Sequence, residues 1–126
     1  MPTRGSAEAS CWDLYTSHDT VLLPGMGTLV PTGVAMGIPP GFCVKVYGRS
    51  SMCRKDIAIS TGIIDSDYTG EIRVQAFNHG MIPVTVYRGD RIGQFMLVKL
   101  AETELEPADT LRETERGSNG WGSTGR

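Results

Sequence analysis

The chain is short of several residue types, and each shortage excludes a class of protein. It has only three cysteines, Cys11, Cys43 and Cys53, with no CxxC spacing among them. We therefore expect neither a disulfide framework nor a zinc site, but three reduced and mostly buried thiols. The two histidines, His18 and His79, are far apart and have no companion ligands nearby in the sequence, which favours surface turns over a metal centre.

Long hydrophobic runs and blocks of like charge are also missing. The N-terminal segment MPTRGSAEAS has no apolar run of signal-peptide length, and no segment approaches the roughly 20 apolar residues that span a bilayer. The 12 basic and 14 acidic residues are interspersed and give a net charge of -2, which indicates neither nucleic acid nor a membrane surface as partner. We expect a soluble cytoplasmic or nuclear protein, cellular or encoded by a virus or phage, that acts on a small molecule.

The 126 residues, 40% of them apolar, fit one domain with one core. Glycine and proline separate short apolar or alternating stretches between residues 13 and 100, which predicts strands rather than helices. The expected strands are 28–36, 42–47, 56–60, 63–65, 72–77, 83–87 and 92–100, with one helical turn at 51–54. The predicted fold is all-β, a jelly-roll-like distorted barrel or sandwich with one short helix.

Alternation within two of these strands predicts which side chains face the core. In FCVKVYG, one face holds Phe42, Val44 and Val46, and the other holds Cys43, Lys45 and Tyr47. In EIRVQAF, one face holds Ile72, Val74 and Ala76, and the other holds Arg73, Gln75 and Phe77. We expect the outward Arg73 and Gln75 to line a subunit interface.

The composition changes after residue 100, and we divide the chain into a β-barrel domain (1–100), a polar linker (101–115) and a glycine-rich arm (116–126). The arm, RGSNGWGSTGR, combines convergent backbone N–H groups with hydroxyls and Arg116, a combination that suits phosphate oxygens. Trp121 would cover a flat ligand, although the composition alone equally suits a disordered tail. The fifteen linker residues reach up to about 50 Å, enough for a site on the same or a neighbouring subunit.

Four further segments have residues suited to chemistry, and each also has a plainer interpretation. In STGIIDSDYTGEI, Asp65 and Tyr68 follow a tight turn among apolar residues, where a buried carboxylate needs a task or a partner; turn capping explains the same pattern. Arg49 in YGRSS offers a guanidinium or simply ends a strand before a helix cap. Gln94 in GDRIGQF either faces an anion or faces solvent, and Asp13 lies in SCWDL.

In this order and spacing the segments resemble the trimeric dUTP pyrophosphatase (dUTPase) family. The five motifs stand here as SCWDL, GRSS, GIIDSDYTGEI, GDRIGQ and RGSNGWGSTG, so the resemblance covers residues 7–126. It implies a homotrimer with active sites at the subunit boundaries and a mobile C-terminal arm. It also implies Mg²⁺-dependent hydrolysis of dUTP to dUMP and pyrophosphate, through water attack on the α-phosphorus.

The resemblance also implies a role for each matched residue. Asp65 would orient and deprotonate the water, and Tyr68 would pack on the deoxyribose and exclude a 2′-hydroxyl. Main-chain groups around Gly62 and Ile63 would pair with uracil, and Asp13 would meet a magnesium ion through its waters. The phosphates would be held by Arg49, Ser50, Ser51 and Gln94. The arm would close over the ligand through Arg116, Trp121, Gly122, Ser123 and Thr124.

Some positions depart from the family pattern or bear on alternatives. Trp121 replaces the usual phenylalanine, and Ile59 stands where some members place a base-reading asparagine, so base recognition would rest more on main-chain groups. A dCTP deaminase would need a glutamate where Gln75 stands, and an amide cannot accept the proton, which disfavours deamination. A non-catalytic, nucleotide-sensing module of the same fold is the alternative from a different functional class.

Overall fold

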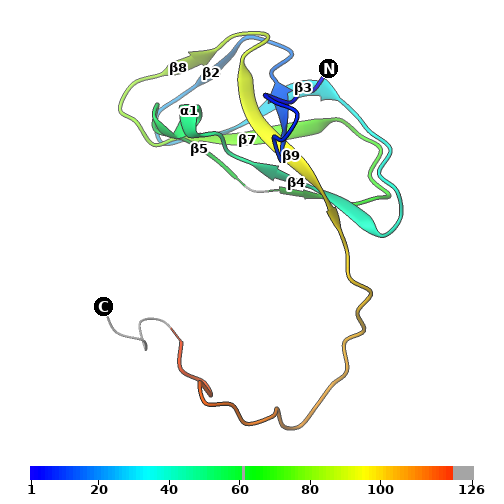
Figure 1. The fold of residues 1–126 in the computed structure, drawn as a ribbon. Helices are drawn as coiled ribbons and strands as arrows, with labels where there is room; N and C mark the ends of the chain where they lie inside the picture. The colour runs from blue at the N-terminus through cyan, green and yellow to red at the C-terminus, as the bar shows by residue number, and fades with distance from the viewer. Residues whose placement is uncertain (61, 121–126) are drawn as a thin grey trace.

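A computed structural model of the chain describes residues 1–60 and 62–120. The predictions for Trp121, Gly122, Ser123 and Thr124 lie outside the described residues. Within that part, the chain forms short strands and one helix of a single turn (Figure 1). They are β1 Trp12–Tyr15, β2 Thr20–Leu22, β3 Gly27–Val34, β4 Phe42–Tyr47, α1 Ser50–Cys53, β5 Ile57–Ile59, β6 Gly62–Ile64, β7 Ile72–Asn78, β8 Val84–Val86 and β9 Arg91–Lys99.

The described strands pair antiparallel in three sheets. Their orders are β1-β9-β4-β6, β3-β7-β5 and β2-β8, and they surround one core without joining into a single closed barrel within the described residues. The all-β class, the short helix and all seven expected strands are confirmed. The short strands β1 and β2 were not expected.

The core confirms the predicted alternation in β7 but not throughout β4. Burial alternates strictly along β7, with Ile72, Val74 and Ala76 buried and the residues between them exposed. In β4, Cys43 is buried together with its neighbour Val44, so the two predicted faces of this strand are not distinct there. A small side chain in an inner strand is easily shielded by larger neighbours on the flanking strands.

The expectation of mostly buried thiols was wrong. Cys43 is buried, but Cys11 is only partly buried and Cys53 is exposed. Cys11 precedes β1 and Cys53 ends α1, so neither lies within a strand.

One polar side chain is completely enclosed at the end of β7. Asn78 is 1% exposed, and its Nδ2 donates to the carbonyls of Leu22 and Ile82, both at 2.8 Å. Its Oδ1 accepts the N–H of Gly80 at 2.9 Å. The Asn78 amide therefore connects β2 to the hairpin that follows β7. Both of its N–H groups and its oxygen have hydrogen-bond partners.

Beyond β9 the chain leaves the sheets. Residues 101–120 are exposed and contain neither a helix nor a strand, and they run in an open arc away from the domain (Figure 1). Among the described residues, no helix is long and apolar enough to cross a membrane.

Candidate functional site

Three of the predicted functional segments meet in one row of the four-stranded sheet. Asp13 on β1 pairs with Gln94 on β9, and Gln94 pairs in turn with Tyr47 at the end of β4. The next row pairs Val46 with Gly62 of β6. The strand register thus brings segments that are distant in the sequence into one row across the sheet. This row lies directly before the turn that holds Arg49.

Asp13 is the centre of a charged cluster, which we call the Asp13 cluster: Asp13, Arg49, Ser51 and Arg91. The Asp13 side chain is only 10% exposed, and its Oδ1 lies 2.8 Å from Arg49 Nε while its Oδ2 lies 3.3 Å from Arg91 Nη1. Arg49 Nη1 also donates to Ser51 Oγ at 3.2 Å and to the Arg91 carbonyl at 3.4 Å. Two guanidiniums thus compensate one enclosed carboxylate, as burial of a charge requires.

The strand-end and helix-cap interpretation holds for the backbone of Arg49 but does not account for its side chain. Arg49 occupies the N-cap position of α1 with an extended backbone, but its side chain makes no capping hydrogen bond. The guanidinium instead lies against Asp13. The hydroxyl-bearing residues Ser50 and Ser51 open the helix beside it, both exposed.

Gln94 is part-buried rather than directed to solvent. Its Nε2 donates to the carbonyl of Gly48 at 2.7 Å, which fixes the turn immediately before Arg49. The Asp13 cluster carries one negative and two positive charges, so it retains a net positive charge beside two serine hydroxyls. Such a site attracts an anion with several oxygens, because guanidinium forks and hydroxyls both donate to them.

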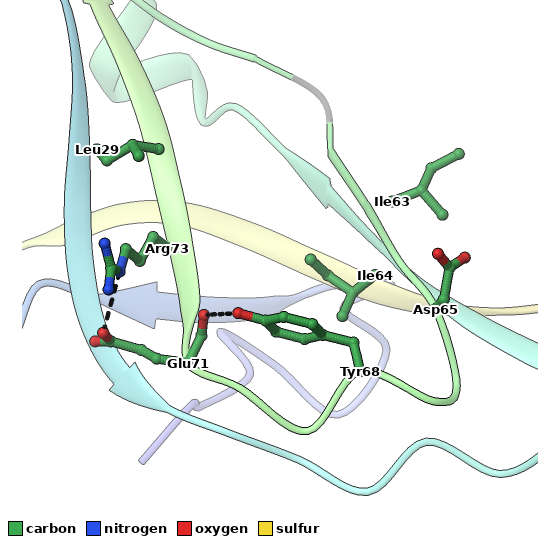
Figure 2. A pocket seen from close by; sticks show the side chains of 7 residues that line it. All are labelled: Leu29, Ile63, Ile64, Asp65, Tyr68, Glu71 and Arg73. Atoms are coloured by element: carbon green, nitrogen blue, oxygen red, sulfur yellow. Dashed lines mark hydrogen bonds and ion pairs between the residues drawn. The ribbon is translucent and has the colours of Figure 1, made fainter.

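The segment with Asp65 and Tyr68 forms a second site. A pocket of about 400 Å³ opens here (Figure 2) and is lined by Leu29, Ile63, Ile64, Asp65, Tyr68, Glu71 and Arg73. The Tyr68 N–H donates to the Asp65 carbonyl at 3.2 Å, which closes the turn between them. In the view of Figure 2 the Tyr68 ring points toward Glu71, and the Asp65 carboxylate points away from it.

The expected burial of Asp65 is not found in the single chain. Asp65 is exposed, and so is its neighbour Ile63, with 61% of its surface accessible. Of the two isoleucines beside the carboxylate, Ile63 is exposed to solvent, whereas Ile64 is partly buried and packs against the core. An exposed carboxylate beside an exposed isoleucine is suited to a surface that another molecule covers.

The two sites are separate within one chain. The pocket lining includes Asp65 and Tyr68 but neither Arg49 nor Gln94. Asp65 follows the pair Ile64–Val44, so it lies four residues along the sheet from the row of Tyr47, a distance of roughly 13 Å. The fold alone does not bring the predicted water-activating carboxylate beside the Asp13 cluster.

Two residues of this region were not singled out from the sequence. Arg91 lies inside GDRIGQ and Glu71 inside TGEI, so the motifs contained the signal, but nothing in the sequence showed which partner each one meets. The Gly33 N–H donates to the Glu71 carboxylate and, together with Arg73 and the Thr32 N–H, lowers the pKa of Glu71 from its ordinary value of 4.5.

The remaining predicted residues are placed as follows. Gly62 is partly buried in β6, and Arg116 is exposed, with its Nε donating to the Asn119 carbonyl at 2.9 Å. Among residues 1–60 and 62–120, no three acidic, histidine or cysteine side chains gather as a metal-ion site.

The fold and the two sites define an all-β protein with an anion-attracting cluster at one sheet edge and a pocket on a neighbouring β-turn. The family model described as dUTPase matches residues 1–125. The deoxyuridine 5′-triphosphate nucleotidohydrolase of Mus musculus is 40% identical over 126 residues, which cover 99% of this chain and 78% of the mouse protein. The Saccharomyces cerevisiae enzyme of the same name is 38% identical over 128 residues, 99% of this chain and 86% of the yeast protein. The chain belongs to the dUTPase family.

The solved structures agree in fold. A Staphylococcus bacteriophage 80alpha dUTPase, the G164S mutant with dUpNHpp, superimposes with a TM-score of 0.93 over 100% of this chain and 92% of the phage chain. Its sequence is 24% identical. At this level of identity the likeness shows a shared fold, and the resemblance seen in the motifs is confirmed by the family match.

Proposed function

We propose that this chain is a dUTP diphosphatase that hydrolyses dUTP to dUMP and pyrophosphate. The observation that most supports this is that a chain of this family carries both the positively charged Asp13 cluster and an exposed carboxylate at Asp65. The named relatives that match over nearly the whole chain are deoxyuridine 5′-triphosphate nucleotidohydrolases. Phosphoryl transfer needs mainly positioning and charge neutralisation, and the two sites supply both.

The nucleoside would bind at the pocket of the Asp65–Tyr68 turn. The Tyr68 ring, 46% exposed, offers a flat surface to the deoxyribose and leaves no space for a 2′-hydroxyl. Main-chain groups around Gly62 and Ile63 would read the uracil edge. Because Ile59 is apolar and cannot supply the amide that some relatives use, these main-chain groups would bear most of the base recognition.

The triphosphate would bind at the Asp13 cluster. The Arg49 guanidinium contacts Asp13 and donates to the hydroxyl of Ser51, with the exposed Ser50 next to it in the chain. Gln94 donates only one of its two amide hydrogens to Gly48, so the other remains for a phosphate oxygen. Three different kinds of donor would thus converge on one anion.

Asp65 would act as the general base. An exposed carboxylate can hold a water and accept its proton while the water oxygen forms a bond to the α-phosphorus. The bond from the α-phosphorus to the bridging oxygen then breaks, and pyrophosphate leaves in line. Because the carboxylate need not touch the phosphates, its role is separable from binding.

The residues present fit a magnesium ion held mainly by the substrate. Both oxygens of Asp13 already face guanidiniums, which disfavours direct ligation, yet each oxygen can still accept a hydrogen bond from a metal-bound water. Mg²⁺ prefers to keep several waters and to bind phosphates. When bound, it would neutralise phosphate charge, and Asp13 would orient its waters.

The active sites would be shared between subunits of a homotrimer. The separation of Asp65 from Arg49 in one chain supports this, since a neighbouring copy can bring the two together. The exposed Leu29 and Ile63, and the outward Arg73 and Gln75, would line the contact between copies.

The C-terminal arm would complete the site. Residues 101–120 run away from their own domain, which supports a reach toward another subunit. Arg116 with Ser123, Thr124 and Gly122 would close over the β- and γ-phosphates, and Trp121 would stack on the base. Closure would exclude bulk solvent while keeping the one attacking water at Asp65.

The test is pyrophosphate release by the purified protein with Mg²⁺, comparing dUTP, dCTP, dTTP and UTP. We expect release from dUTP and at most slow release from the other three, since base and sugar are both read. Tryptophan fluorescence, to which Trp12 and Trp121 both contribute, should change on adding dUTP in the same samples. Absence of release from dUTP would refute the proposed function.

A further inference from the structure

Glu71 joins two strands where their pairing is interrupted. The ladder between β3 and β7 shifts register between Pro31 and Val34. There the Glu71 carboxylate accepts the N–H groups of Thr32 at 3.1 Å and Gly33 at 2.7 Å. A bulge frees backbone amides from the ladder, and the carboxylate supplies the acceptor that they need.

The same residue holds the ring of Tyr68. The Tyr68 hydroxyl donates to the main-chain carbonyl of Glu71 at 2.9 Å (Figure 2). A Cβ placed on Gly70 would lie 2.6 Å from that hydroxyl, so the ring lies directly over the main chain of Gly70. The position of the ring is therefore set by residues 70 and 71.

The two contacts are coupled through one short piece of backbone. The carboxylate of Glu71 fixes its own backbone to β3, and that backbone carries the carbonyl to which Tyr68 binds. Arg73 Nε lies 3.4 Å from the other carboxylate oxygen and restrains it further. If the carboxylate no longer reached Gly33, the carbonyl would move, and the ring with it.

We propose that Glu71 is a positioning residue that sets the sugar preference by fixing Tyr68. The inference rests on the proposed function, in which Tyr68 faces the deoxyribose. A displaced ring leaves room for a 2′-hydroxyl, so UTP gains relative to dUTP. Glu71 touches no reacting atom in this account, and Asp65 keeps its role.

Three substitutions separate reach from charge. Glu71→Ala removes the carboxylate, and Glu71→Asp keeps the charge but withdraws it by about 1.5 Å, the length of one carbon–carbon bond. Glu71→Gln keeps an oxygen at the same reach and loses the charge. We expect the first two to lower the preference for dUTP over UTP about tenfold and the third to change it less than about threefold.

The readout is the ratio of kcat/KM for dUTP to kcat/KM for UTP, measured by pyrophosphate release with Mg²⁺. This ratio does not depend on the fraction of folded protein, so a merely structural role would leave it unchanged. Glu8→Ala, at an exposed position in the N-terminal segment, is the matched control and should keep the wild-type ratio. Should Glu71→Ala fail to fold, the comparison of Glu71→Asp with Glu71→Gln still tests the positioning role.

The outcomes distinguish this inference from the proposed function. If the wild-type protein prefers dUTP and Glu71→Asp is equally selective, the positioning role of Glu71 is overturned and the proposed function stands. Equal loss in Glu71→Gln and Glu71→Asp also overturns it, because the glutamine oxygen still reaches the amides. A wild-type protein that releases no pyrophosphate from dUTP overturns both.

Discussion

The Oδ1 atom of Asp13 lies 2.8 Å from the Nε atom of Arg49, and this contact connects β1 to the turn that follows β4. Both side chains are mostly enclosed, with 10% and 18% of their surfaces exposed. The contact fixes the guanidinium that we expect to face a phosphate. It also means that Asp13 has a structural task in the free protein, in addition to any role beside a metal ion.

Loss of the Asp13 charge should destabilise the protein. Asp13→Asn leaves two guanidiniums with a neutral partner, and we expect the free energy of unfolding to fall by about 2 kcal/mol. Arg91→Ala should cost less than about 1 kcal/mol, because the Arg91 side chain is half exposed. Urea unfolding of both variants measures the difference, and equal losses would contradict the central place of Asp13.

Asp65→Asn should separate binding from turnover. The amide cannot accept the proton from water, so we expect kcat to fall by roughly three orders of magnitude. Binding of dUTP should stay within a few-fold, since the phosphates are expected at Arg49 and not at Asp65. Calorimetric titration with a non-hydrolysable dUTP analogue and pyrophosphate release test the two halves, and retained turnover would remove Asp65 from the mechanism.

Gly70→Ala should displace the Tyr68 ring with little effect on stability. The added Cβ would lie 2.6 Å from the hydroxyl, and an exposed ring can move away. We expect KM for dUTP to rise about tenfold while the unfolding midpoint stays close to that of the wild type. Gly5→Ala, where no heavy atom lies within 4 Å of the new Cβ, serves as the control, and an unchanged KM in Gly70→Ala would show that the ring does not contact the substrate.

The stabilising effect of Glu71 should depend on pH. Its pKa in the folded protein is lowered, chiefly by the N–H of Gly33. The charged carboxylate therefore stabilises the folded state relative to the unfolded state. The stabilisation is then fully present above the ordinary value of 4.5 and is lost as pH falls through the lowered pKa. Urea unfolding at pH 7 and below pH 4 should show the difference between wild type and Glu71→Gln shrinking toward acid; a difference that grows would reverse the sign of the linkage.

Asn78 should be among the most sensitive positions of the fold. Asn78→Leu removes three hydrogen bonds at a fully enclosed site, leaving the carbonyls of Leu22 and Ile82 and the N–H of Gly80 without this partner. We expect a loss of about 3 kcal/mol. Thermal unfolding measures it, and a loss below 1 kcal/mol would mean that water replaces the amide.

Much of the fold was predictable because its signals are local. The alternation in residues 72–77 predicted a strand with one buried face, and β7 has that pattern. The glycine and proline turns marked the strand ends in the same way. Strands β1 and β2 were not predicted. They pair with β9 and β8, which lie far along the chain, and such long-range pairing cannot be seen in the sequence of a short segment.

The motifs supplied candidate residues for the site but not the contacts between them. The five motifs indicated Asp13, Arg49, Asp65, Tyr68 and Gln94, because their chemistry and spacing match one family. No local pattern showed that Asp13 binds Arg49 and Arg91, or that Gln94 holds the Gly48 carbonyl. These contacts depend on which rows of the sheet coincide, and the register of β1 on β9 and of β9 on β4 settles that.

By itself, the sequence determined the class of fold, the family and the chemical types of the site residues, since these follow from short-range patterns and motif spacing. Only the tertiary structure decided that Asp65 stays exposed and apart from the Asp13 cluster, and that Glu71 reaches across to β3. The physical reason is that a hydrogen bond or ion pair forms only when the two atoms lie within roughly 3 to 4 Å. Distances of that order between remote residues are set by strand pairing and packing, not by neighbours in the sequence.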